Sequence, residues 1–114
     1  MMKIVNVLEV LSSKNEGVFI PMLPFNASSF STCDITGESP VWEMHPDTDE
    51  FFYIIDGEFE MTVLREGLSS TYVAHSGDAF VVPKGVWHKP SANNGCKFIY
   101  HTPGQSVHSE NPEE

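Results

Sequence analysis

The chain has 114 residues, and 16 Asp and Glu against 6 Lys and Arg give it a formal net charge of −10 at pH 7. This length suits one domain with one core, and the negative charge disfavours nucleic acid and anionic membrane surfaces as partners. The N-terminal run has no small-residue cleavage site after it, and no apolar run approaches the roughly 20 residues that cross a bilayer. We therefore expect a cytoplasmic protein with Cys33 and Cys96 as reduced thiols.

Short apolar and β-branched segments, separated by turn residues, follow one another along residues 3 to 100. The clearest alternation places Phe59, Met61 and Val63 on one face of a strand and polar residues on the other. No segment of ten or more residues has a helical period. The pattern predicts an all-β sandwich or barrel, because closing a sheet removes its exposed edges. The expected strands are 5–10, 17–23, 30–35, 40–45, 50–55, 58–63, 71–75, 78–83, 86–90 and 96–102.

Turn residues and the polar C-terminus complete the predicted organisation. Asp56-Gly57 predicts a hairpin between strands 50–55 and 58–63, because such turns need residues with positive φ. Residues 105–114 are polar and acidic, so we expect a flexible tail there, after a single domain over 1–104.

Four side chains that can bind metal ions lie near the ends of predicted strands. Glu43 and His45 are two residues apart, so they share one face of an extended strand. Glu50 begins the next strand after a turn-forming run, and His88 begins a returning strand after a Pro-Lys-Gly turn. Two imidazoles and a carboxylate are a common ligand set for Fe(II) and related ions.

The two segments that carry these residues resemble the two motifs of the cupins. The first motif is Gly, five residues, His-x-His, three or four residues, Glu, six residues, Gly. The second is Gly, five residues, Pro-x-Gly, two residues, His, three residues, Asn. Residues 37–57 and 77–92 keep every spacing, but Glu43 replaces the first histidine and Ala92 the asparagine. The matching positions are Gly37, Glu43, His45, Glu50 and Gly57 in the first motif, and Gly77, Pro83, Gly85 and His88 in the second.

The resemblance implies a double-stranded β-helix, or jelly-roll barrel, with a divalent Fe, Mn, Zn or Ni ion near one mouth. His45, Glu50 and His88 would hold the ion. Glu43 is either a fourth ligand or a carboxylate that orients another ligand. Phe52 is a predicted wall of the pocket, while His75, His101 and His108 match no motif and are assigned no role.

Cupins have many functions, so the resemblance implies a site more than a reaction. The leading hypothesis is a small metal-binding cupin that binds a small molecule at the open positions of the ion, and a metal-dependent dioxygenase or isomerase is one form that this function could take. The alternatives are a non-catalytic ligand-binding or sensor module, and a metal-free sugar isomerase or epimerase in which Glu50 and His88 do acid–base chemistry. Small cupins commonly pair, and the apolar segment 4–10 exceeds what one barrel needs, so we expect a homodimer.

Overall fold

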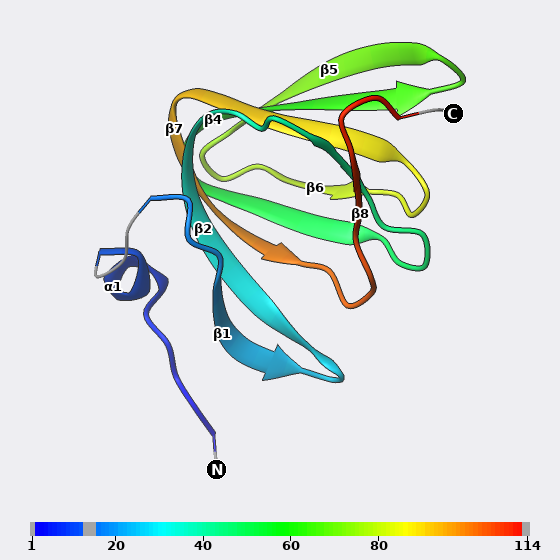
Figure 1. Ribbon diagram of the computed structural model, residues 1–114. Coiled ribbons are helices and arrows are strands. Elements are labelled where there is room, and N and C mark those ends of the chain that lie inside the picture. The colour runs from blue at the N-terminus through cyan, green and yellow to red at the C-terminus, as the bar shows by residue number, and fades with distance from the viewer. Residues whose placement is uncertain (1, 13–15, 113–114) are drawn as a thin grey trace.

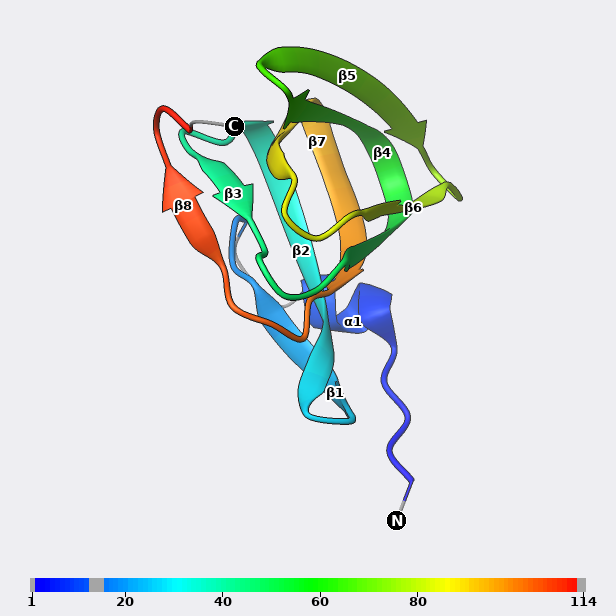
Figure 2. The same cartoon turned by 90° about the vertical axis from the view of Figure 1, so that its right-hand side faces the viewer.

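In the computed structural model, which describes residues 2–12 and 16–112, eight strands form one curled antiparallel sheet with the shape of a half-barrel (Figures 1 and 2). The strand order is β1-β2-β7-β3-β8, and β4 pairs with β5, β6 and β7. The predicted all-β jelly-roll class is confirmed. The elements are α1 (Val7–Ser12), β1 (Ile20–Phe25), β2 (Ser28–Glu38), β3 (Trp42–Met44), β4 (Glu50–Arg65), β5 (Leu68–His75), β6 (Ala79–Val82), β7 (Trp87–His101) and β8 (Val107–Ser109).

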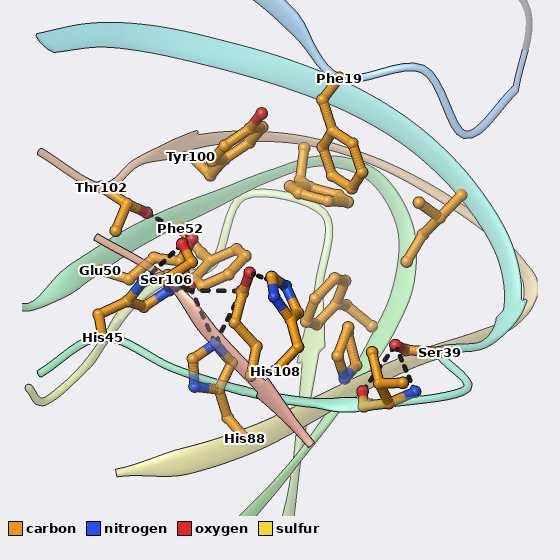
Figure 3. A pocket seen from close by; sticks show the side chains of 16 residues that line it. Phe19, Ser39, His45, Glu50, Phe52, His88, Tyr100, Thr102, Ser106 and His108 are labelled. Carbon is orange, nitrogen blue, oxygen red and sulfur yellow. Dashed lines mark hydrogen bonds and ion pairs between the residues drawn. The ribbon is translucent and has the colours of Figure 1, made fainter. Parts of the chain in front are cut away.

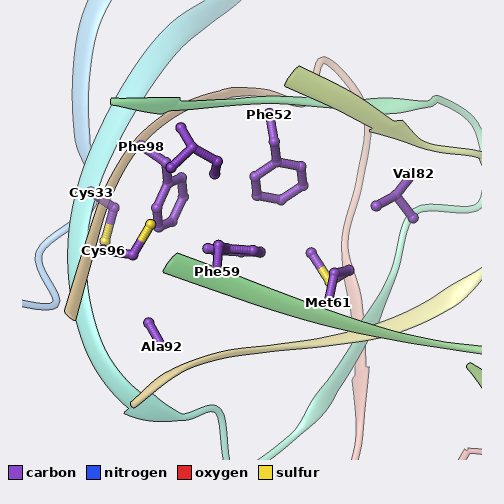
Figure 4. Packing of buried hydrophobic residues seen from close by; sticks show 9 residues of the cluster. Cys33, Phe52, Phe59, Met61, Val82, Ala92, Cys96 and Phe98 are labelled. Carbon is purple, nitrogen blue, oxygen red and sulfur yellow. The ribbon is translucent and has the colours of Figure 1, made fainter. Parts of the chain in front are cut away.

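The interior of the half-barrel is built mainly by the inward faces of β4, β7 and β2. Along β4 the residues Glu50, Phe52 and Ile54 are buried, whereas Tyr53 between them is exposed. Phe59 is fully buried and packs against Phe52, as Figure 4 shows. Burying a large apolar side chain contributes roughly 1.5–3 kcal/mol to the free energy of folding, so this cluster is the main hydrophobic stabilisation of the fold. Its members are Cys33, Phe52, Ile54, Phe59, Met61, Val82, Ala92, Cys96 and Phe98.

The hairpin predicted at Asp56-Gly57 is wrong, because β4 continues through these residues. Its register against β7 shifts on both sides of Gly57, and the strand bends there without reversing. Gly57 has φ of 102°, and a Cβ at this position would collide with the carbonyl oxygen of Gly95. The actual hairpin follows Arg65, where Glu66 and Gly67 with φ of 52° and 76° join β4 to β5.

The N-terminal segment predicted as a strand over 5–10 contains the helix α1 instead. The Asn6 side chain caps this helix, since its Oδ1 accepts a hydrogen bond from the backbone N–H of Glu9 (3.0 Å). Leu11 is buried, but Ile4 and Leu8 remain exposed, so the expected homodimer stays a prediction. Within the part of the chain that the structure describes, no helix is long and apolar enough to cross a membrane.

The C-terminal residues also differ from the expectation of a flexible tail from residue 105. Val107–Ser109 form β8, which pairs with all three residues of β3. The segment is short and polar, so its sequence carries no strand signal. It forms a strand because β3 offers it an unpaired edge.

Candidate metal centre

Strand register brings the two motif segments together. Glu43 on β3 lies directly opposite His88 on β7, so both side chains project from the same face of the sheet. His45 lies just beyond the end of β3, and Glu50 is the first residue of β4. The turn between them, residues 46–49, folds the chain back so that His45 and Glu50 meet. The structure thus gathers the four residues that the sequence predicts as ligands.

The four side chains converge on one point. Oε1 of Glu50 lies 3.0 Å from Nε2 of His45 and 3.0 Å from Nε2 of His88. Oε1 of Glu43 lies 3.3 Å from each of the same two nitrogens. One ligand atom from each of the four residues lies within 4.8 Å of all the others. His45, Glu50 and His88 are buried, whereas the side chain of Glu43 is 30% exposed.

Backbone carbonyls orient both imidazoles. Nδ1–H of His88 donates a hydrogen bond to the carbonyl oxygen of Val86 (3.1 Å), and Nδ1–H of His45 donates to that of Gln105 (3.2 Å). In the neutral tautomer that these bonds select, Nε2 carries a lone pair. Both lone pairs then face the carboxylate oxygens of Glu43 and Glu50. With both imidazoles neutral, the centre has four acceptors and no donor between them, so it needs a proton or a metal ion.

The electrostatics of the metal-free centre reflect this concentration of acceptors. Burial alone would lower the pKa of His45, but hydrogen bonds and charges from Glu43 and Glu50 raise it to about 10. The pKa of His88 is raised to about 9 in the same way. Burial would raise the pKa of Glu50, yet hydrogen bonds from both histidines and from Thr102 hold it below its usual value. The centre therefore attracts cations, whether protons or metal ions.

The donor set fits a divalent ion. Ligands at right angles around an ion at roughly 2.1 Å lie about 3.0 Å apart, and the observed separations from Glu50 to each histidine are 3.0 Å. Two neutral imidazoles and two carboxylates would balance the charge of the ion. The geometry also favours Glu43 as a ligand over a purely orienting role, since its Oε1 faces both imidazoles.

A cavity of about 560 Å³ opens beside the centre. Figure 3 shows His45, Glu50 and His88 at one end of it, away from Phe19 and Ser39. Most of the other walls are apolar, and no Lys or Arg of the described chain lines it. Phe52 is one of the walls, as the sequence analysis expects. The remaining lining residues are Ile35, Val41, Glu43, Phe59, Pro90, Phe98, Tyr100, Thr102, Ser106 and His108.

The sequence analysis missed a group of residues that follow the last motif. Thr102 Oγ1–H donates a hydrogen bond to Oε2 of Glu50 (2.5 Å), and Oγ of Ser106 lies 3.1 Å from Nδ1 of His45. His108 Nε2–H donates to Oε2 of Glu43 (3.0 Å). Each contact is on an atom that faces away from the centre. No motif or periodicity marks these residues in a single sequence, because only the pairing of β8 with β3 places His108.

Residues 33–108, most of the chain, match the Cupin_2 family, described as the cupin domain. The chain is a cupin. A cupin-2 domain protein of Shewanella frigidimarina NCIMB 400 has a similar structure, with a TM-score of 0.79 and 30% identity over 88% of this cupin and 94% of that chain. The family resemblance drawn from the two motifs is confirmed.

Other solved structures share the fold at lower similarity. Hydroquinone 1,2-dioxygenase of Sphingomonas sp. TTNP3, solved with 4-hydroxybenzoate bound, aligns with a TM-score of 0.70 and 16% identity over 83% of this cupin and 70% of that chain. Oxalate decarboxylase of Bacillus subtilis, described with Mn(II) centres, aligns with a TM-score of 0.57 and 26% identity over 70% of this cupin and 22% of that chain. The rice protein cupincin (Oryza sativa subsp. indica) is 44% identical over 42 residues, which span 37% of this cupin and only 9% of cupincin.

Proposed function

We propose that this cupin binds a divalent metal ion through Glu43, His45, Glu50 and His88, and that the ion and the cavity together bind a small organic molecule. One observation carries the proposal: one ligand atom from each of two carboxylates and two imidazoles converges on one point, which holds no donor when the imidazoles are neutral. Such an arrangement is costly unless a cation occupies its centre. A set with two carboxylates favours Mn²⁺ or Fe²⁺ more than a set with three imidazoles does, although Zn²⁺ and Ni²⁺ compete by the Irving–Williams order.

The charge of the site bears on the kind of molecule. A divalent ion with two carboxylates carries no net charge, and the described cavity wall has no Lys or Arg that would pair with an anion. Aromatic and aliphatic side chains form most of the wall. We infer an uncharged or singly charged molecule with an apolar body and one or two oxygen donors, rather than a compact dianion.

The chain's own groups have distinct roles in this scheme. His45, His88 and Glu50 are buried and fixed, so they would hold the ion rigidly. Glu43 is partly exposed, so among the four ligands it is the one most accessible to a molecule in the cavity. A bound Fe or Mn ion would supply Lewis acidity or an O₂-binding position. Dioxygenation and isomerisation are the two reactions that this combination supports.

Metal analysis and ligand binding test the proposal. Protein loaded with Mn²⁺ or Fe²⁺ and then desalted should retain about one ion per chain. Uncharged phenols and hydroxyketones should bind the loaded protein more tightly than oxalate or other dicarboxylates, in calorimetry or by displacement of a fluorescent probe. Oxygen uptake with a bound compound would identify a dioxygenase, and turnover without uptake to a product of unchanged mass would identify an isomerase.

The remaining outcomes separate the alternatives. Tight binding without turnover across a metabolite library would identify a ligand-binding module. Turnover that survives complete removal of metal would support acid–base chemistry by Glu50 and His88 instead. A protein that retains no divalent ion under any loading condition would contradict the proposal.

A further inference from the structure

Three residues from different strands lie side by side in one row across the sheet. Glu43 in the middle strand β3 is directly opposite His88 of β7 on one side and His108 of β8 on the other. Residues paired in this way project from the same face, with Cβ atoms roughly 5 Å apart. The strand register therefore directs His108 to the metal centre, and Figure 3 shows it at the same end of the cavity as His88.

The two oxygens of the Glu43 carboxylate have separate partners. Oε1 faces Nε2 of His45 and of His88, at 3.3 Å from each. Oε2 accepts a hydrogen bond from Nε2–H of His108 at 3.0 Å. A hydrogen bond to a carboxylate is stronger than one between neutral groups. With Oε2 engaged in this way, only Oε1 is directed to the centre.

The carboxylate of Glu50 is held in the same way, with one oxygen at the centre and the other in a hydrogen bond. Without His108, Glu43 would lose the second of these two contacts. Oε1 of Glu50 faces the two imidazoles, while its Oε2 accepts a hydrogen bond from Thr102. However, the side chain of Glu50 is only 5% exposed, so packing also holds it. The side chain of Glu43 is 30% exposed and depends more on its hydrogen bonds to keep one rotamer.

We propose that His108 is a positioning residue of the metal centre, which holds Glu43 as a ligand through one oxygen. This inference rests on the proposed metal-binding function. Without His108, the Glu43 side chain would rotate between conformers that direct either oxygen, both or neither to the ion. The average affinity for metal would fall, and the environment of the ion would become heterogeneous.

Binding of Mn²⁺, measured by calorimetry and by electron paramagnetic resonance at a fixed pH, tests the proposal. His108→Ala should weaken binding about 10-fold, within the 10- to 100-fold range of groups that orient ligands, and should broaden the Mn²⁺ spectrum. His108→Gln, whose amide can still donate to Oε2, should recover part of the affinity and narrow the spectrum. If His108→Ala disturbs the fold, His108→Gln alone still tests the proposal.

His75 provides a matched control. It is an exposed histidine on β5, which does not pair with β8, with Nε2 3.2 Å from Oε2 of Glu58, and its side chain is 63% exposed against 53% for His108. His75→Ala removes a similar surface histidine–glutamate pair away from the metal centre. It should leave both the affinity for Mn²⁺ and the spectrum unchanged.

A double-mutant cycle decides whether His108 acts through Glu43. In a Glu43→Ala background, His108→Ala should cause no further loss of affinity, because the carboxylate that it positions is gone. An equal loss in both backgrounds, or no loss in the parent, would overturn the proposal. If His45→Ala abolishes binding while His108→Ala does not weaken it, only this inference fails. If the parent binds no Mn²⁺, the proposed function fails and this inference with it.

Discussion

The interior of this cupin has two halves that share the strands β4 and β7 but are held together differently. On the inward face of β4, Glu50 lies at the polar end, while Phe59 lies beyond the bend at Gly57 in the apolar end. Around Phe59 the neighbours are aromatic rings and thiols with centroid distances of 5.2–5.9 Å between the rings. Around Glu50 the neighbours are imidazoles and a second carboxylate.

This difference shows which half of the interior is satisfied by its own side chains and which half needs a bound cation. Apolar side chains in the Phe59 half satisfy one another by close contact, and they need nothing from solution. In the polar half the hydrogen bonds to carbonyls and hydroxyls use the outward atoms, and the inward atoms are left to bind a proton or a metal ion. The first half stabilises the fold, and the second requires a cation to be neutral. Substitutions in the two halves should therefore separate stability from metal binding.

The largest effect is expected from the imidazoles. His45→Ala or His88→Ala should abolish stoichiometric metal, because each removes a buried ligand and the water that replaces it cannot hold the ion as tightly. Metal content by mass spectrometry after loading and desalting checks this, with His101→Ala, outside the cluster, as the control. Full occupancy in both variants would mean that the polar half is not a metal centre.

A core substitution should show the opposite behaviour. Phe59→Ala should lower the free energy of unfolding by about 3–5 kcal/mol, because it leaves a cavity among tightly packed rings. Leu68→Ala, at a residue that is 74% exposed, should change it by less than about 0.5 kcal/mol. Denaturant titration of the metal-free proteins measures both. The folded Phe59→Ala protein should still bind one ion per chain, and loss of the ion would show that the two halves are coupled.

The pH dependence of metal binding resolves the chemistry of the polar half. The pKa values of His45 and His88, raised to about 10 and about 9, mean that the metal-free protein holds protons which the ion must displace. Affinity should rise about 10-fold per pH unit for each displaced proton between roughly pH 6.5 and 8.5.

The stability of the metal-free protein should change in the opposite direction. A raised pKa in the folded state contributes stability that is fully present below about pH 6.5, the usual value for histidine, and is lost as the pH rises through about 9 and 10. Calorimetry in weakly coordinating buffers and thermal melts measure the two trends. Affinity that is flat with pH would contradict the assignment of these protons to the ligand atoms.

The motif residues could be predicted from sequence because their chemistry and their spacing lie within short segments. Glu43 and His45 share a face by strand alternation, and the cupin spacing relates them to Glu50 and His88. The role of Glu43 was left open, since sequence alone does not say whether its oxygen reaches the imidazoles. His108 could not be predicted at all, because its position depends on the pairing of β8 with β3.

The fold was predictable in class but not in its local turns. Alternation identified the buried face of β4 correctly at Phe59 and Met61. Asp56-Gly57 has the sequence of a hairpin turn, yet the close approach of Gly95 makes it a bend within one strand. The apolar N-terminal segment had a strand-like composition, but the cap at Asn6 begins a helix there.

The row His88–Glu43–His108 also has a consequence for the order of events during biosynthesis. Glu43 and His108 are 65 residues apart in the sequence, so at roughly 5–20 residues per second the ribosome releases the second several seconds after the first. The nascent chain would then expose Glu43, His45 and Glu50 well before β8 can pair with β3. We therefore expect the finished fold, and not the emerging chain, to select the metal ion, from whatever ions the surrounding compartment supplies at that moment.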